Sequence, residues 1–211
     1  MEVKKKGGEM MRKKLVLFIM LILLFTIKQE IEAIGAGGTI FIDQFEVEEG
    51  QWSYNEGFSP YIALNAKYND NLFFSLSGMK SSHQADDKYK LGEKELTIKS
   101  GELDYLQILL NAKYNFRANK ILQPFIIAGG GSYKFDFDIE AEANDPESNI
   151  QAIKHQVKNE VGFGANLAVG MDFKIRENLL IGIDGRYNYI ISDYYQGGAF
   201  NLIFDISYGF R

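Results

Sequence analysis

The last twelve residues, FNLIFDISYGFR at positions 200–211, decide the fold of this chain. Successive side chains of a β-strand point to opposite faces, so the alternation predicts a strand with one apolar face and one mostly polar face. Its length exceeds the ~5–6 residues of a common globular strand and suits the ~9–11 residues of a tilted strand that crosses a bilayer. The apolar, lipid-facing row is predicted to be Phe200, Leu202, Phe204, Ile206, Tyr208 and Phe210.

Seven segments upstream repeat this alternation, which brings the predicted count to eight strands. The connections alternate in length: turns near 69–71, 117–120 and 176–178 are short, whereas 43–58, 81–100 and 139–160 are long. An even count allows the sheet to close and removes the open edges that a bilayer does not tolerate. The strands are expected near 35–43, 58–68, 72–80, 105–116, 124–137, 161–175, 179–191 and 200–211.

Two architectures fit this pattern, a membrane barrel with its apolar face outward and a soluble lipocalin-like carrier with its apolar face inward. Long strands and loops that are short at one rim and long at the other favour the membrane barrel. The carrier would need large rings from all eight strands inside one narrow barrel. We therefore predict an all-β, eight-stranded antiparallel up-and-down transmembrane β-barrel. Aromatic residues at its short-turn rim are Tyr68, Tyr114, Phe116, Phe173 and Phe210.

Residues 1–33 are predicted to be a signal peptide and residues 34–211 the barrel domain. A basic cluster precedes an unbroken apolar run, Leu15 to Ile27, and a polar stretch then ends at the small residue Ala33. This order is typical of a secretory signal, and Met11 is an alternative start. The run is shorter than the ~20 residues of a spanning helix, although an uncleaved anchor helix is the alternative. We expect export to the outer membrane of a bacterium with two membranes.

Composition excludes several classes of protein. The chain of 211 residues has no cysteine, which rules out disulfides, thiolate zinc sites and a cysteine nucleophile. Removing the 7 basic and 4 acidic residues of positions 1–33 from totals of 23 and 28 leaves 16 against 24, a net charge of −8. So acidic an exported chain is not expected to bind nucleic acid. It has no P-loop, dinucleotide fingerprint or HExxH helix, so we expect no cofactor.

The polar face of the strands carries charges that we expect inside the barrel. Eight strands leave an interior that side chains fill, and an unpaired charge buried there costs several kcal/mol. The charges are therefore predicted to pair into a salt-bridged plug; the alternative is a gated proton or ion path. The predicted interior network is Lys67, Lys113, Lys134, Asp136, Asp172, Lys174, Asp184, Arg186 and Asp205.

Groups suited to catalysis are sparse. The two histidines, His83 and His155, fall in predicted loops, and Ser81, Ser82 and Asp86 near His83 are the minimal set for a nucleophile and a base. A lipid-modifying enzyme would need such a histidine at the lipid-facing rim, with a carboxylate in hydrogen-bond reach. We predict no catalytic residue and no enzymatic activity.

The long connections are acidic. Their spacing is not that of a calcium-binding loop, so we interpret them as solvated segments and predict no metal site. Binding of divalent ions and contact with a partner are the alternatives. The acidic residues are Glu46, Glu48, Glu49, Asp86, Asp87, Asp145 and Glu147.

Several stretches are typical of a known family: Leu103 to Asn115, Pro124 to Tyr133 with its glycine triplet, Gly162 to Phe173, Asp184 to Tyr189, and the terminal strand. Through them the chain resembles the small outer-membrane β-barrel family of OmpA-, OmpX- and PorT-type barrels, often labelled porin-family proteins. The resemblance implies assembly by the barrel-assembly machinery, which in this family recognises a terminal aromatic residue. Here Arg211 follows Phe210. PorT-type relatives imply accessory work in secretion.

The sequence thus predicts a non-enzymatic outer-membrane barrel with a plugged polar interior. We expect it to act in envelope structure, in surface interaction, or as a membrane anchor of a larger assembly. Its expected partners are outer-membrane lipid, the barrel-assembly machinery and a protein that meets the long loops. The alternatives are a narrow porin or transport channel, an outer-membrane lipid-modifying enzyme and a soluble ligand-binding barrel.

Overall fold

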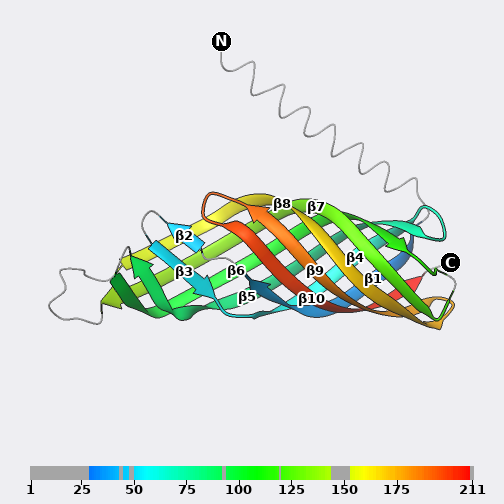
Figure 1. Cartoon of the computed structure of the whole chain (residues 1–211), viewed down its shortest axis with the longest axis horizontal. Coiled ribbons are helices and arrows are strands. Elements are labelled where there is room, and N and C mark those ends of the chain that lie inside the picture. Colours follow the sequence, from blue (N-terminus) through cyan, green and yellow to red (C-terminus); the bar gives the residue numbers. More distant parts are fainter. Residues whose placement is uncertain are drawn as a thin grey trace, which may run out of the picture.

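The structure, a computed structural model, is an elongated barrel of tilted strands (Figure 1). It describes residues 29–42, 45–47, 50–91, 94–118, 120–143 and 153–209. Within these residues no helix is both long and apolar enough to cross a membrane. The strands are β1 (Gln29–Phe41), β2 (Phe45–Val47), β3 (Gly50–Tyr54), β4 (Gly57–Lys67), β5 (Leu72–Leu91), β6 (Lys94–Asn115), β7 (Leu122–Ala143), β8 (Ile153–Arg176), β9 (Leu179–Ile191) and β10 (Gln196–Gly209).

Eight of these strands close the barrel, which confirms the predicted fold. Every neighbouring pair is antiparallel, and the ring runs β5-β4-β1-β10-β9-β8-β7-β6 and back to β5. The closing strand is β10: Phe204 pairs with Ala36 of β1 on one side and with Ile183 of β9 on the other. Because the ring is complete, the backbone groups of these strands are paired with neighbours, as a bilayer requires.

The short turns lie together at one end of the barrel. In the turn between β4 and β5, Asn69 Oδ1 accepts hydrogen bonds from the backbone N–H groups of Asn71 and Leu72, both at 2.9 Å. A short amide side chain that bonds its own backbone two or three residues ahead stabilises such a turn. At the same end, Gly209 N donates to Asn178 O at 3.0 Å.

The predicted long loops are largely strand, so this expectation was wrong. β5 and β6 run through most of 81–100, β7 and β8 extend into 139–160, and the 43–58 segment contains β2 and β3. β3 pairs with the far end of β5, with Gly50 opposite Leu91. These extensions are held by continued strand pairing. Their outward positions face water rather than lipid and carry charges, which gave these segments the composition of a loop. Inward positions such as His83 and Ile139 are buried.

The N-terminal boundary of the barrel differs from the predicted domain boundary. β1 begins at Gln29, before the predicted mature start at Ile34, and Ala33 pairs with Ala63 of β4 and Ser207 of β10. Residues 1–28, which include the apolar run of the predicted signal, lie outside the described residues. Cleavage after Ala33 stays a prediction.

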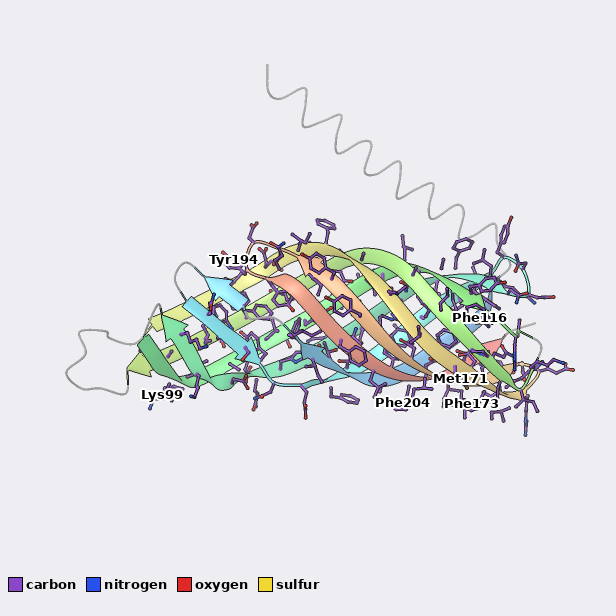
Figure 2. All side chains as sticks on the ribbon, viewed as in Figure 1. Lys99, Phe116, Met171, Phe173, Tyr194 and Phe204 are labelled. Carbon is purple, nitrogen blue, oxygen red and sulfur yellow. The ribbon has the colours of Figure 1, made fainter. Side chains whose placement is uncertain are left out.

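The outer face of the barrel carries a continuous apolar band next to the short-turn end. On β10, Phe204 is 54% exposed, whereas Asn201, three residues earlier on the opposite face, is fully buried inside. The band ends where outward positions become charged, at Lys80 of β5, Asp104 of β6 and Lys134 of β7. Figure 2 shows Phe116 at the short-turn end and Lys99 at the opposite end of the molecule. Beyond the band, β5 to β8 form what we call the platform: residues 81–91, 94–105, 132–143 and 153–160.

Candidate functional site

The half of the barrel interior nearest the short turns is polar. Lys113 of β6 donates to Asp172 of β8 with Nζ and Oδ2 2.6 Å apart, and the Asp172 side chain is only 2% exposed. The Lys113 ammonium also lies 3.8 Å from the centre of the Phe125 ring. Opposite charge, a short hydrogen bond and an aromatic face together compensate the loss of water around this ammonium group.

A second ion pair lies deeper in the interior. The Arg186 Nη2 atom of β9 is 3.4 Å from Asp184 Oδ2, and the exposed fractions of the two side chains are 0% and 3%. The guanidinium is 5.6 Å from the centre of the Tyr61 ring of β4. Among the described residues, Arg186 Nε and Nη1 and Asp184 Oδ1 have no hydrogen-bond partner. The pair is therefore held by one long hydrogen bond and by charge attraction.

A third carboxylate, Asp205 of β10, points toward the same space. Ser207 Oγ donates to Asp205 Oδ1 at 2.9 Å. A Cβ atom on Gly182 would meet Asp205 Oδ2 at 2.6 Å and Asp172 Oδ1 at 3.1 Å, so the two carboxylates converge over this glycine. The missing side chain at Gly182 is what gives them room.

Amide side chains fill the interior above the ion pairs. Asn166 Nδ2 donates to Asn111 Oδ1 at 2.9 Å, and Asn111 Nδ2 donates to Ser77 Oγ at 3.1 Å. Further along, Tyr105 Oη donates to Gln107 Oε1 at 2.9 Å. These bonds link β5, β6 and β8 across the lumen with uncharged groups.

The structure brings together five members of the predicted interior network: Lys113, Asp172, Asp184, Arg186 and Asp205. Two others lie at the short-turn rim, where Lys67 pairs with Asp70 at 3.0 Å and Lys174 is partly exposed.

Lys134 and Asp136 were wrongly assigned to the interior. They pair with each other at 2.6 Å on the outer face of β7, whereas the alternate positions Tyr133 and Phe135 are buried inside. Assigning these charges to the interior implied that the rings of the opposite parity, Phe125 included, face lipid, and this was wrong as well. For Tyr133 and Phe135 the physical reason is that this half of β7 has water outside, so large rings turn inward and charges turn outward. Phe125 lies in the bilayer half, where its ring faces the lumen and contacts the Lys113 ammonium.

The interior at the platform end is packed with aromatic rings, which we call the aromatic plug. Phe41 lies at its centre: its ring centroid is 5.2 Å from that of Tyr105, 5.4 Å from Tyr195 and 5.3 Å from Phe45. Edge-to-face contacts of this kind add to the stabilisation from burial. Sequence reasoning missed the plug, because it placed Phe135 and Phe137 on the lipid side and left Phe45, Trp52 and Tyr54 in a long connection. Its members are Phe41, Phe45, Trp52, Tyr54, Tyr105, Phe135, Phe137 and Tyr195.

His83 is buried beside the plug rather than exposed in a loop. Its Nδ1–H donates to the backbone carbonyl of Asn55 at 2.8 Å, so Nε2 is free to accept from the Ser81 hydroxyl, also at 2.8 Å. Its ring centroid is 5.0 Å from that of Phe41. Burial lowers the pKa of His83, and the hydrogen bond to Asn55 only partly offsets this.

The serine, histidine and carboxylate side chains considered as possible catalytic groups do not come together in one site. Ser82 Oγ donates to Asp104 Oδ1 at 2.6 Å on the outside of the barrel, and Ser53 donates to Asp86. The orienting partner of His83 is a backbone carbonyl, not a carboxylate. The side chain of His155 lies outside the described residues. His83 thus faces the interior, not the lipid-facing rim that the lipid-modifying alternative required.

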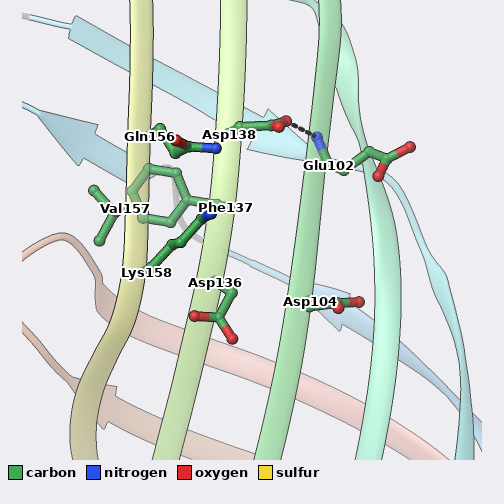
Figure 3. A pocket seen from close by; sticks show the side chains of 8 residues that line it. All are labelled: Glu102, Asp104, Asp136, Phe137, Asp138, Gln156, Val157 and Lys158. Atoms are coloured by element: carbon green, nitrogen blue, oxygen red, sulfur yellow. Dashed lines mark hydrogen bonds between the residues drawn. The ribbon is translucent and has the colours of Figure 1, made fainter.

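The platform carries a shallow outer hollow of about 140 Å3 (Figure 3). Glu102 and Asp138 face each other across β6 and β7, and the Glu102 N–H donates to Asp138 Oδ1 at 3.3 Å. The hydroxyl of Ser82 and the ammonium of Lys80 lower the pKa of Asp104. Lys134 and the Asn159 N–H likewise lower the pKa of Asp136. Hydrogen bonds thus favour the ionised forms of Asp104 and Asp136.

No group of three or more His, Cys, Asp or Glu side chains is placed to hold a metal ion in the described part of the chain. Of the acidic residues predicted in the loops, Asp86 accepts a hydrogen bond from Ser53. The side chains of the other six, Glu46, Glu48, Glu49, Asp87, Asp145 and Glu147, lie outside the described residues.

Solved structures share this architecture. Neisserial surface protein A is 16% identical, with a TM-score of 0.53, and the match covers 86% of this chain and 96% of that chain. The Escherichia coli outer membrane protein W is 16% identical, with a TM-score of 0.49 over 86% and 98% of the two chains. At 16% identity, the likeness to Neisserial surface protein A shows the fold alone. No curated protein matches the sequence.

A third structure corrects one prediction. The outer membrane protease OmpT from Escherichia coli is 13% identical, with a TM-score of 0.50 over 86% of this chain and 97% of that chain. The prediction of a non-enzymatic protein is overturned by this match, because the same fold serves a protease. The barrel alone gives no ground for excluding catalysis.

The family itself is shown by the sequence match. The family model of the outer membrane protein beta-barrel domain matches residues 16–210, nearly the whole chain. The closed ring of eight strands and the apolar outer band agree with this match. The chain therefore belongs to the outer membrane protein beta-barrel domain family and is a protein of the outer membrane.

Proposed function

We propose that this barrel is closed to solutes and acts at the cell surface, where its platform contacts molecules outside the cell. The observation that carries the proposal is the length of β5 to β8, which have 20 to 24 residues. A membrane crossing uses only ~9–11 residues, so about half of each strand projects beyond the bilayer. Outer-membrane barrels place short turns in the periplasm, which puts the platform outside.

The platform is suited to recognition because it is rigid and its outer face is charged. Its strands stay paired far from the membrane, with Lys88 opposite Thr97 and Ala141 opposite Ile153. The aromatic plug fills its inner side, so outward charges such as Glu102 are presented from a fixed scaffold. Charges in fixed positions favour selective contact with complementary surfaces.

Adhesion of whole cells tests the surface role. Cells that express the chain are expected to adhere more strongly than vector-only cells to at least one of three coatings, a basic, a sulfated and a neutral polysaccharide. The platform carries carboxylates, so the gain is expected on the basic coating, and the Glu102→Lys/Asp138→Lys variant should lose it there. Asp70→Lys, at the periplasmic rim, is the matched control and should keep it. Equal adhesion with and without the chain would contradict the proposal.

A narrow channel is the competing function, and the filled interior argues against it. Ion pairs, hydrogen-bonded asparagine side chains and the aromatic plug occupy successive levels of the lumen. We expect purified protein in planar bilayers to show no sustained conductance. Stable openings from the wild-type protein would instead favour a transport role.

We infer that residues 1–33 direct export and are then removed. Without Gln29 to Ala33, β1 would still pair from Ile34, opposite Ile62 of β4 and Ile206 of β10. Intact mass measurement of the protein extracted from outer membranes tests this. A mass that includes residues 29–33 would show that cleavage occurs before Gln29 and not after Ala33.

A further inference from the structure

A groove of about 610 Å3 crosses the outer face of the barrel where β1 lies between β4 and β10. We call it the seam groove. Ala36 and Gly38 of β1 form its floor, and Phe58 of β4 and Phe200 and Phe204 of β10 are among its walls. The lining is apolar except for Glu56 at one end.

Strand register explains the shape of the groove. Gly38 lies between Phe58 of β4 and Leu202 of β10, and two residues earlier Ala36 lies between Pro60 and Phe204. Two successive outward positions of the central strand therefore carry almost no side chain, while both neighbouring strands carry large ones. A trough along β1 is the result.

The backbone does not require glycine at the centre of this trough. A Cβ atom at Gly38 would meet only Gly57 O, at 3.8 Å, which is an ordinary contact. At Gly37, by contrast, a Cβ atom would lie 2.2 Å from Leu202 O. Gly37 thus permits a close approach of strands, whereas Gly38 leaves open space on the outer surface.

The groove lies in the half of the apolar band that is nearer the cell exterior. β1 starts at the short-turn end, where Ile31 pairs with Gly209, and it ends at Phe41 in the aromatic plug. Since short turns are periplasmic in outer-membrane barrels, Ala36 and Gly38 face the outer leaflet. Glu56 then lies toward the level of the lipid headgroups.

We propose that the seam groove binds one acyl chain of an outer-leaflet lipid. In a bilayer an unfilled trough would deprive its apolar lining of dispersion contacts, and an acyl chain is the flexible, unbranched group that can lie along it. The neighbouring aromatic walls restrict the chain to the direction of β1. Lipid is thereby held at this seam more firmly than elsewhere on the band.

A second copy of the chain fits the groove poorly. A two-fold dimer would place the same concave surface on both partners, and two troughs facing each other leave a void. The ten residues that line the groove are also fewer than the ~20–30 residues per partner of a stable interface. Both arguments favour a lipid chain over another barrel.

The proposal is tested with a phosphatidylethanolamine that carries a diazirine in the middle of one acyl chain, mixed into vesicles that contain the full-length protein. Illumination should label residues 36–40, 58 and 200–204 in preference to the rest of the band. Gly38→Leu, which fills the trough, should lower this labelling about fivefold, the effect of losing ~1 kcal/mol of affinity. Ala165→Leu, on the outer face of β8, is the control and should leave it unchanged.

Each alternative outcome overturns the proposal. Even labelling around the barrel, or labelling of the groove that survives Gly38→Leu, would show ordinary lipid contact only. Crosslinked dimers through the groove would identify a second copy as its occupant. Heat-modifiable mobility in gels verifies that each variant is folded, and Ala36→Leu replaces Gly38→Leu if the latter does not insert.

Discussion

Arg186 and Asp184 form an ion pair inside the barrel, with Nη2 and Oδ2 3.4 Å apart and almost no exposure to solvent. The two residues lie on the same face of β9 and are separated by one residue. Their unbonded atoms, Arg186 Nε and Nη1 and Asp184 Oδ1, show that charge attraction rather than a complete hydrogen-bond network compensates their burial. Each charge therefore depends on the other.

Removal of one partner should be much more harmful than removal of both. Arg186→Leu removes the nearest counter-charge of the buried Asp184 carboxylate, which is expected to cost ~3–5 kcal/mol of unfolding free energy. The Asp184→Leu/Arg186→Leu double variant should cost clearly less, because no charge is left. Urea titration of refolding into lipid vesicles measures both values. Additive losses would show that the two charges do not depend on each other.

An exposed ion pair at the short-turn rim provides the control for these single and double variants. Lys67 and Asp70 are 3.0 Å apart, but their side chains are 34% and 65% exposed. Solvent screening limits such pairs to ~0–1 kcal/mol. Lys67→Leu should therefore change the unfolding free energy little in the same titration.

Phe204 tests which face of β10 meets lipid. Its side chain is 54% exposed on the outer band, so Phe204→Arg should cost ~2–4 kcal/mol and impair insertion. Asn201→Leu, on the inner face, should be milder, because Gln107 Oε1 keeps its hydrogen bond from Tyr105. Heat-modifiable mobility and urea titration report the two effects. Normal insertion of Phe204→Arg would contradict a lipid-facing position.

The sequence predicted the part of the fold in which the outer side of the barrel meets lipid. From Phe200 to Tyr208 the apolar row is continuous, and it lies on the outside as the alternation indicated. Within the bilayer the rule is simple, because one face meets hydrocarbon and the other meets a narrow polar lumen. The eight strands and the short turns followed from this rule. The parity of β7 was nevertheless wrong here too, because Phe125 is buried and Ile126 faces lipid.

The same rule fails beyond the membrane, where both the platform and the aromatic plug were missed. There the outer side meets water, so Phe135 and Tyr133 turn inward and Asp136 turns outward. The alternation of apolar and polar residues is the same whether lipid or water lies outside the barrel, so it does not show which face is apolar. The residues of the interior ion pairs Lys113–Asp172 and Asp184–Arg186 were all predicted to face the lumen. Which residue pairs with which depends on strand register, and the alternation within single strands does not reveal the register.

The buried histidine predicts a pH dependence of stability. The unfolded chain binds a proton at His83 near its usual pKa of 6.5, whereas burial lowers the pKa in the folded state. Between these two values the unfolded state binds more protons, so stability is complete above about pH 6.5 and falls as the pH decreases through the window. The unfolding free energy of the wild type should thus be lower at pH 5 than at pH 7.5.

His83→Gln isolates the histidine from other titrating groups. A glutamine amide can donate to the Asn55 carbonyl and accept from the Ser81 hydroxyl, but it does not titrate. The variant should therefore lose the part of the pH dependence that belongs to His83, because every other ionisable group is common to both proteins. Identical pH profiles for the two proteins would exclude His83 as the source.

Asn159 marks an irregularity in β8 that should tolerate only some residues. Phe135 pairs with Glu160 but Phe137 pairs with Val157, so an extra residue of β8 is accommodated opposite Asp136. Asn159 there has a φ of 61°, and its N–H donates to Asp136 Oδ1 at 2.5 Å. Glycine adopts this backbone region without strain, whereas left-handed backbone costs other residues ~1–2 kcal/mol. Asn159→Gly should therefore retain stability and Asn159→Val should lose it in urea titration; equal stability of the two variants would show that the bulge relaxes.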